Sequence, residues 1–217
     1  MSSETGGSGR SAIRFVLASA SPARRTTLRA AGLDAEIMVS GIDEDTVRAA
    51  PAPQYAQALA REKALAVSGK VGSGVPALIL GCDSVLELDG EILGKPHVPE
   101  VAVERWRRMR GRSGVLHTGH CLIDNRNGRR AEATGSTIVH FADLTDEEIE
   151  AYVATGEPLK VAGGFTVDGL GGPFIDGIEG DHHNVVGLSL PLLRRLVREL
   201  GYAWPELWKI AGGPGAA

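Results

Sequence analysis

Hydrophobic and polar residues change their spacing several times along the chain, and each change predicts a new element. Residues 13–18 form a short apolar run with β-branched and aromatic members, which predicts a buried strand. The run leads to Ser21-Pro22, where a capping serine and a proline at the first helical position predict a helix that stops at Gly32. Such a strand, turn and helix direct backbone N–H groups and a positive dipole end at whatever lies above the sheet.

The rest of the chain continues this alternation. Further strands are predicted over residues 35–40, 75–84, 115–123 and 131–141, with a hairpin over residues 86–93 at the Asp89-Gly90 turn. Further helices are predicted over residues 53–68, 99–110, 145–156 and 188–200, and the glycines between residues 163 and 172 predict an irregular region. Alternating elements followed by strand pairs favour an α/β fold with a mixed sheet.

Length, charge and cysteine usage narrow the class of protein. The 217 residues suffice for one domain, which we expect to span residues 13–210 behind a disordered, Ser/Gly-rich tail at residues 1–12. That tail lacks the pattern of a signal peptide, and no apolar run reaches the roughly 18 residues that would span a membrane. The net charge of −4 argues against broad nucleic-acid binding. Two distant cysteines, Cys82 and Cys121, argue against a disulfide framework or zinc site and favour the cytoplasm.

One apolar run leads directly into a carboxylate. Residues 75–82 suit a buried strand, and Asp83 follows at its predicted end. Because the ligands of open α/β sheets collect beyond the carboxyl ends of strands, Asp83 is predicted to take part in chemistry. The alternative is an ordinary turn aspartate. The hairpin after Asp83 is expected to bring Lys95 back to the same region.

A set of charged residues near predicted turns suits a polyphosphate together with a divalent metal. The cations are Arg24, Lys63 and Lys95, and the carboxylates are Glu44 and Asp83. Mg²⁺ favours one or two carboxylates plus phosphate oxygens, while lysine and arginine neutralise the remaining phosphate charge. The alternative is a scatter of surface salt bridges, which contribute little to stability.

Other nucleotide and nucleophile motifs find less support. Neither G-x-x-x-x-G-K-[ST] nor a G-x-G-x-x-G that follows a strand and opens a helix occurs in the sequence. Cys82 and His117 would form a thiol nucleophile pair, but a lone cysteine at a strand end more often fills a core.

Histidines and tryptophans are also explained without a separate function. Asp181-His182-His183 has no evident third metal ligand and fits a loop feature better than a metal site. The tryptophans at positions 106, 204 and 208 suit helix packing or a dimer surface, because no basic stripe accompanies them.

Seven short motifs, taken together and in order, resemble the Maf family of nucleoside triphosphate pyrophosphatases. They lie at residues 17–25, 41–44, 60–64, 81–84, 93–96, 113–119 and 187–190. The resemblance implies a homodimeric α/β protein with an elongated, bent mixed sheet, flanking helices and a central cleft between two lobes. It also implies hydrolysis of a nucleoside triphosphate between the α and β phosphates with Mg²⁺ or Mn²⁺. A non-catalytic, nucleotide-binding regulator of septum formation and a phosphatase that removes γ phosphates are the alternatives.

Residue roles follow from the resemblance. It implies that Asp83 is the general base or a metal ligand and that Glu44 is a carboxylate on the metal side. Substrate-binding roles are implied for Ser19, Arg24, Lys63, Lys95, Ser113, His117 and Thr118.

Three positions depart from the patterns of the known substrate classes in this family. Ala23 precedes Arg24 where the pyrimidine type carries a first arginine and the 7-methylguanosine type a tryptophan. Ser84 replaces the commoner threonine, and Asp168 stands where the pyrimidine type has glutamine. These positions are predicted to set the base preference, which stays open. Asp168 is either an acceptor for a base N–H or a loop aspartate that caps nearby backbone.

Overall fold

The structure of the chain is a computed structural model that describes residues 13–44, 47, 51–72 and 74–208. The predicted tail at residues 1–12 and the last residues of the predicted domain, 209 and 210, lie outside the described residues. The tail and the single-domain boundaries therefore stay predictions.

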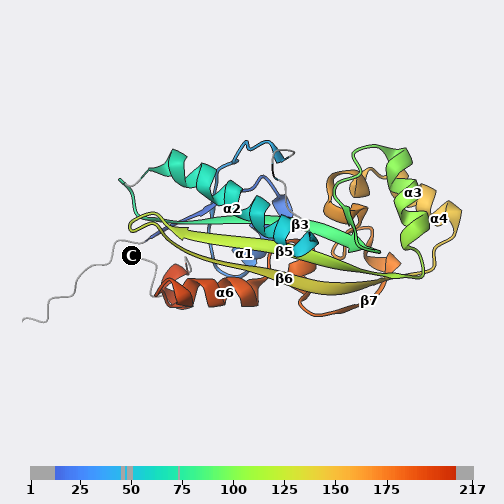
Figure 1. The fold of residues 1–217 in the computed structure, drawn as a ribbon. Helices are drawn as coiled ribbons and strands as arrows, with labels where there is room; N and C mark the ends of the chain where they lie inside the picture. The colour runs from blue at the N-terminus through green and yellow to red at the C-terminus, as the bar shows by residue number, and fades with distance from the viewer. Residues whose placement is uncertain (1–12, 45–46, 48–50, 73, 209–217) are drawn as a thin grey trace, which may run out of the picture.

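The described strands form one mixed sheet in the order β2-β1-β3-β5-β6-β7, with β4 paired to β3. Their bounds are β1 (Arg14–Leu17), β2 (Glu36–Ile37), β3 (Ala77–Leu88), β4 (Glu91–Leu93), β5 (Ser113–Asp124), β6 (Arg129–Phe141) and β7 (Ile175–Glu179). β1 runs parallel to β2 and β3, and the remaining pairs are antiparallel. Three long strands give the molecule its elongated shape (Figure 1). The predicted mixed-sheet α/β fold is confirmed.

Helices cover the two faces of one half of the sheet and gather at the end of the other half (Figure 1). The α-helices are α1 (Pro22–Ala30), α2 (Ala52–Val71), α3 (Pro99–Met109), α4 (Asp146–Ala154), α5 (His182–Val186) and α6 (Leu190–Glu199). Short 3₁₀ turns occur at Glu157–Lys160, Ala162–Gly164, Gly172–Phe174 and Trp204–Leu207. The predicted N-caps of α1 and α4 form, because the hydroxyls of Ser21 and Thr145 accept from the backbone N–H groups of Arg24 and Glu148.

Separate hydrophobic cores belong to the two halves. In one half, Leu28, Leu80 and Leu193 belong to a core on the α6 side of the sheet. On the opposite face, α2 packs through small residues. The other half is built around Trp106 of α3, which meets Phe141 edge-on and donates from Nε1 to the carbonyl of Gly164.

Several predicted elements differ from the observed ones. Residues 35–40 were predicted as a strand, but only Glu36–Ile37 pair with β1. β3 does not end at Asp83, since its pairing with β5 continues as far as Glu87. β7 and α5 have no counterpart among the predicted elements. β7 has glycine and charged residues between its apolar positions, and α5 has only five residues.

The aromatic and histidine predictions find direct explanations. Trp106 is buried, which confirms packing as its role, and Trp204 and Trp208 are partly buried against the first core. A dimer surface at Trp204 and Trp208 stays a prediction. Asp181 accepts from the backbone N–H of His183 and caps α5, so His182 and His183 begin a short helix and do not form the predicted loop. No helix within the described part of the chain is long and apolar enough to cross a membrane.

Candidate active site

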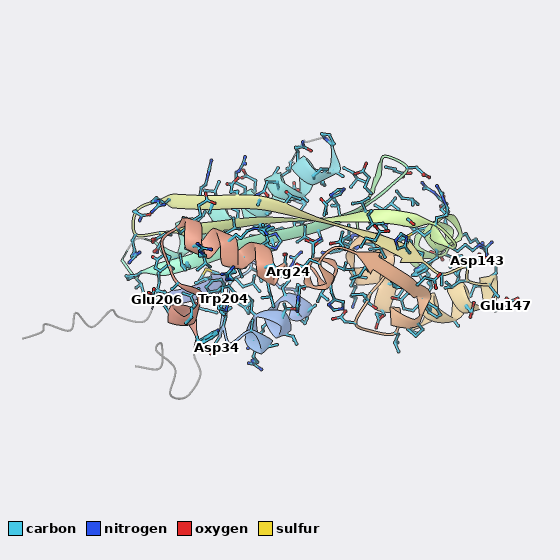
Figure 2. The ribbon with its side chains drawn as sticks, turned by 90° about the horizontal axis from the view of Figure 1, so that it is seen from below. Arg24, Asp34, Asp143, Glu147, Trp204 and Glu206 are labelled. Atoms are coloured by element: carbon cyan, nitrogen blue, oxygen red, sulfur yellow. The ribbon has the colours of Figure 1, made fainter. Side chains whose placement is uncertain are left out.

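A gap in the pairing of β3 creates the candidate site. β1 pairs with β3 up to Leu80, and β4 begins to pair at Leu86. β5 occupies the other edge of β3 throughout this stretch, so no described strand covers the free edge at residues 81–85. A pocket of about 350 Å³ lies at this gap. Figure 2 shows Arg24, which belongs to this region, near the middle of the molecule, with Glu206 toward one end and Asp143 toward the other.

Most of the predicted site residues come together in this pocket, although they belong to different elements. The β1–α1 turn, the segment after β2, α2, β3 and the segment after β4 supply the charged side. Residues 161–168 and α5 supply the facing side. The predicted residues in the lining are Ser19, Ala23, Arg24, Glu44, Lys63, Asp83, Ser84, Lys95 and Asp168.

One ammonium group holds the two candidate carboxylates together. Lys63 Nζ lies 2.5 Å from Asp83 Oδ1 and 2.7 Å from Glu44 Oε1. Lys63 and Asp83 are only 9% and 8% exposed. Partial burial by itself raises the pKa of Glu44, but the hydrogen bond and charge of Lys63, with the charges of Lys95 and Arg24, outweigh burial and lower it. These neighbours therefore favour the charged form of Glu44.

Two glycines let α2 approach the sheet closely enough for Lys63 to reach Asp83. A Cβ atom on Gly81 would lie 2.1 Å from the carbonyl oxygen of Ala60, and one on Gly119 would lie 2.3 Å from that of Ala56. Real Cβ atoms do not approach backbone oxygens so closely. The absence of side chains at Gly81 of β3 and Gly119 of β5 thus sets the distance between α2 and these two strands.

Arg24 fastens the β1–α1 turn to its surroundings. Its Nε donates to the carbonyl of Gly187 at 2.7 Å, and Nη1 donates to the carbonyl of Cys82 at 2.8 Å and to Ser19 Oγ at 3.1 Å. Nη2 donates to Ser84 Oγ at 3.1 Å. A guanidinium has five N–H donors, so these contacts leave one donor and the positive charge for a ligand. Arg24 therefore holds the β1–α1 turn against the free edge of β3 and also fixes the segment at Gly187.

Comparisons with known proteins give the family. The family model described as "Maf-like protein" matches residues 14–200. The chain belongs to the Maf family. A "Nucleoside triphosphate pyrophosphatase" of Salinispora tropica is 59% identical over 203 residues, which are 93% of this chain and 90% of that protein.

A second relative of the same name, from Streptomyces coelicolor, is 58% identical over 195 residues, which are 90% of this chain and 94% of the relative. Among solved structures, the Staphylococcus aureus Ham1 protein aligns with a TM-score of 0.39 and 17% identity over 60% of this chain and 72% of that one. That likeness is too distant to bear on function.

Three residues of the Maf motif at 113–119 are not part of the pocket lining. Thr118 lies behind it, where its hydroxyl donates to the carbonyl of Asn184 and contacts Ser84 Oγ at 2.9 Å. His117 instead contacts Glu87 and Ser136, and Ser113 Oγ contacts His140. The structure therefore does not bring Ser113 and His117 to the site, although they share a motif and a strand with Thr118.

Cys82 is a core residue and not a nucleophile. It is fully buried, and burial raises the pKa of its thiol to about 12. On the adjacent strand β5, Cys82 pairs with His120, whereas His117 pairs with Val85. The predicted filler role is confirmed.

His120 supports the site from inside the protein, and the sequence analysis did not single it out. Its Nδ1 lies 3.0 Å from the carbonyl of Thr118, and Nε2 accepts from the backbone N–H of Ser189 at 2.9 Å. Ser189 caps α6 and stands two residues after Gly187, whose carbonyl accepts from Arg24. Burial lowers the pKa of His120 to about 4, and the charge of Arg24 acts in the same direction. The only signal in the sequence was its place directly after the motif at 113–119.

Acid should weaken the fold through His120. An unfolded histidine takes up a proton near pH 6.5, but native His120 does so only near pH 4, so protonation favours the unfolded chain between these values. We expect the free energy of unfolding to fall by about 3 kcal/mol as the pH drops through this window. Urea unfolding at pH 7, 6 and 5 measures this. His120→Gln should show a flatter pH dependence, and an equal slope in both proteins would contradict the prediction.

Proposed function

We propose that this Maf protein hydrolyses nucleoside triphosphates, standard or modified, between the α and β phosphates to give a monophosphate and pyrophosphate. The observation that carries the proposal is the convergence of Arg24, Lys63 and Lys95 with Glu44 and Asp83 in one pocket. Three cations in a cavity of about 350 Å³ suit a polyphosphate anion. The names of the relatives agree with this activity.

Asp83 is the proposed base. Phosphoryl hydrolysis needs an oriented water and neutralisation of charge on the phosphate oxygens. Lys63 contacts Oδ1 of Asp83, which leaves Oδ2 to accept a proton or a hydrogen bond from water. Ser19, Arg24, Lys63 and Lys95 would bind the triphosphate, while Thr118 would act indirectly by holding Ser84 and α5.

A divalent cation, Mg²⁺ or Mn²⁺, fits the carboxylates of Glu44 and Asp83. Both are oxygen ligands, both line the pocket, and both contact the same ammonium nitrogen, so their oxygens lie near each other. Mg²⁺ is commonly bound by one or two carboxylates plus substrate phosphates. When bound, the metal would neutralise phosphate charge, while Lys63 keeps the carboxylates in place.

Base preference is proposed to depend on Ala23, Ser84 and Asp168. All three line the pocket, and Ser84 also accepts from Arg24. Asp168 belongs to the facing side of the pocket, where its carboxylate can accept from a base N–H group. Because these three positions differ from the patterns of the known substrate classes, the preferred base has to be determined by experiment.

The test is incubation of the purified protein with a panel of triphosphates and Mg²⁺ or Mn²⁺, followed by product identification. Monophosphate and pyrophosphate are the expected products, whereas diphosphate and phosphate would indicate a γ phosphatase. Binding with no turnover would support the septum regulator, which the names of the relatives do not favour. The same panel with Asp168→Ala should show a changed base profile, and an unchanged profile would remove Asp168 from recognition.

Quaternary structure and location complete the proposal. Family resemblance supports a homodimer, and two free cysteines suit the reducing cytoplasm. Size-exclusion chromatography with light scattering would measure the molar mass of the protein in solution. The mass of a single 217-residue chain would contradict the proposed dimer.

A further inference from the structure

The two sides of the pocket differ in charge. The cations of the lining come from the β1–α1 turn, from α2 and from the segment after β4. The lining residues between 161 and 168, here called the facing wall, are Val161, Ala162, Phe165, Thr166, Val167 and Asp168, and they include no cation. Apolar side chains suit the base and sugar of a nucleoside. The carboxylate of Asp168 repels phosphate groups, which carry the same sign of charge. The nucleoside end of the substrate therefore belongs at the facing wall.

One carboxylate outside the pocket lining holds this wall in shape. Glu157 Oε1 accepts from the hydroxyl of Thr166 at 2.5 Å, from the hydroxyl of Tyr152 at 3.0 Å and from the backbone N–H of Gly171 at 3.0 Å. Its Oε2 accepts from the backbone N–H of Leu170 at 3.0 Å. These contacts lie on both sides of Asp168 in the chain, so the segment that presents Asp168 wraps around Glu157.

The loop at residues 166–171 packs closely around the Glu157 carboxylate, and its donors favour the charged form of that carboxylate. A Cβ atom on Gly169 would lie 2.6 Å from Glu157 Oε2, which leaves no room for a side chain between the loop and the carboxylate. Partial burial raises the pKa of Glu157, but the hydrogen bonds of Thr166, Leu170 and Gly171 outweigh it and lower the pKa. The described partners of the carboxylate are all donors, and such charge-assisted hydrogen bonds are stronger than neutral ones.

We propose that Glu157 is a positioning residue for nucleoside recognition: it fixes Thr166 and the backbone around Asp168 at the facing wall without touching the substrate. The inference rests on the proposed function for the identity of the ligand. It assigns Glu157 to binding of the nucleoside end and leaves the phosphate end to the charged side of the pocket.

Glu157→Gln is the sharpest test, because it keeps the size of the side chain and turns one acceptor oxygen into an N–H₂ donor. That donor would face backbone or hydroxyl donors of the loop. For the preferred triphosphate we expect the KM to rise about tenfold and kcat to stay within about twofold. The inhibition constant of inorganic tripolyphosphate, which has no base, should stay within about twofold.

Glu148→Gln is the matched control. Glu148 also accepts from a backbone N–H group, that of Thr145, but it belongs to the capping box of α4 and not to the pocket. It should lower the melting temperature without changing the KM. An equal KM in both variants, or an equal weakening of nucleotide and tripolyphosphate binding in Glu157→Gln, would overturn the inference.

A binding measurement separates this inference from the proposed reaction. Calorimetric titration with the four ribonucleoside monophosphates and with tripolyphosphate needs no turnover. Selective loss of monophosphate affinity in Glu157→Gln would support the inference even if the wild-type protein hydrolysed nothing. Failure of every monophosphate to bind the wild-type protein would overturn it.

Discussion

Asp83→Asn should keep the fold and lose turnover by at least about a hundredfold, the lower range for removal of a general base. The amide has nearly the same shape, and its oxygen can still accept from Lys63 Nζ, which lies 2.5 Å from Oδ1 in the wild-type protein. It cannot take a proton from water. Pyrophosphate release at saturating triphosphate measures the loss.

Asp124→Asn is the control for Asp83→Asn. Asp124 is also a buried aspartate that accepts from a cation, Arg126, but it is the last residue of β5 and lies outside the pocket lining. Its replacement should destabilise the protein and leave the turnover of the folded fraction within about twofold. Near-normal turnover of a folded Asp83→Asn variant would remove Asp83 from the proposed mechanism.

Gly81→Ala should lower both stability and turnover. The new methyl group would overlap the carbonyl oxygen of Ala60 and contact Ala64 at 2.9 Å, so α2 has to move away from β3. Overpacking of this kind costs about 1–3 kcal/mol. The same movement withdraws Lys63 from Asp83, and misplacement of a positioning group by about 1 Å can cost on the order of a hundredfold in rate. Urea unfolding and pyrophosphate release measure the two effects.

Gly69→Ala provides the comparison within the same helix. A Cβ atom there has no neighbour within 4 Å, and residue 69 is exposed near the end of α2. Replacement of a helical glycine by alanine should leave turnover unchanged and stabilise by about 0.5–1 kcal/mol. If Gly81→Ala kept wild-type stability and turnover, the close approach of α2 to Gly81 would not be what positions Lys63.

The sequence predicted elements well where local signals agreed. Ser21 and Pro22 mark the start of α1, Thr145 and Glu148 mark the start of α4, and apolar alternation predicts the long strands. It failed where pairing decides the outcome. Residues 35–40 look like a strand, yet only Glu36–Ile37 pair, because they meet the last two residues of β1, Val16 and Leu17, and β1 ends there.

The motif at 113–119 shows the limit for individual site residues. Its residues alternate between the two faces of β5, so membership of one motif does not place them in one pocket. Thr118 reaches Ser84, whereas His117 contacts Glu87. Sequence position alone cannot distinguish these two residues. Packing decides which face of β5 contacts α2 and which face contacts α5.

By itself, the sequence determined the fold class, the family and the charged residues of the proposed site, because residue types and short-range spacing carry that information. Only the tertiary structure decided which groups meet. It placed Asp83 inside β3 at an edge that no described strand covers, paired most N–H donors of Arg24 with groups of the protein itself, and brought Glu157 into contact with Thr166 and Gly171 on either side of Asp168. These contacts join residues that are distant in the chain, so their distances depend on how closely helices, loops and sheet can pack.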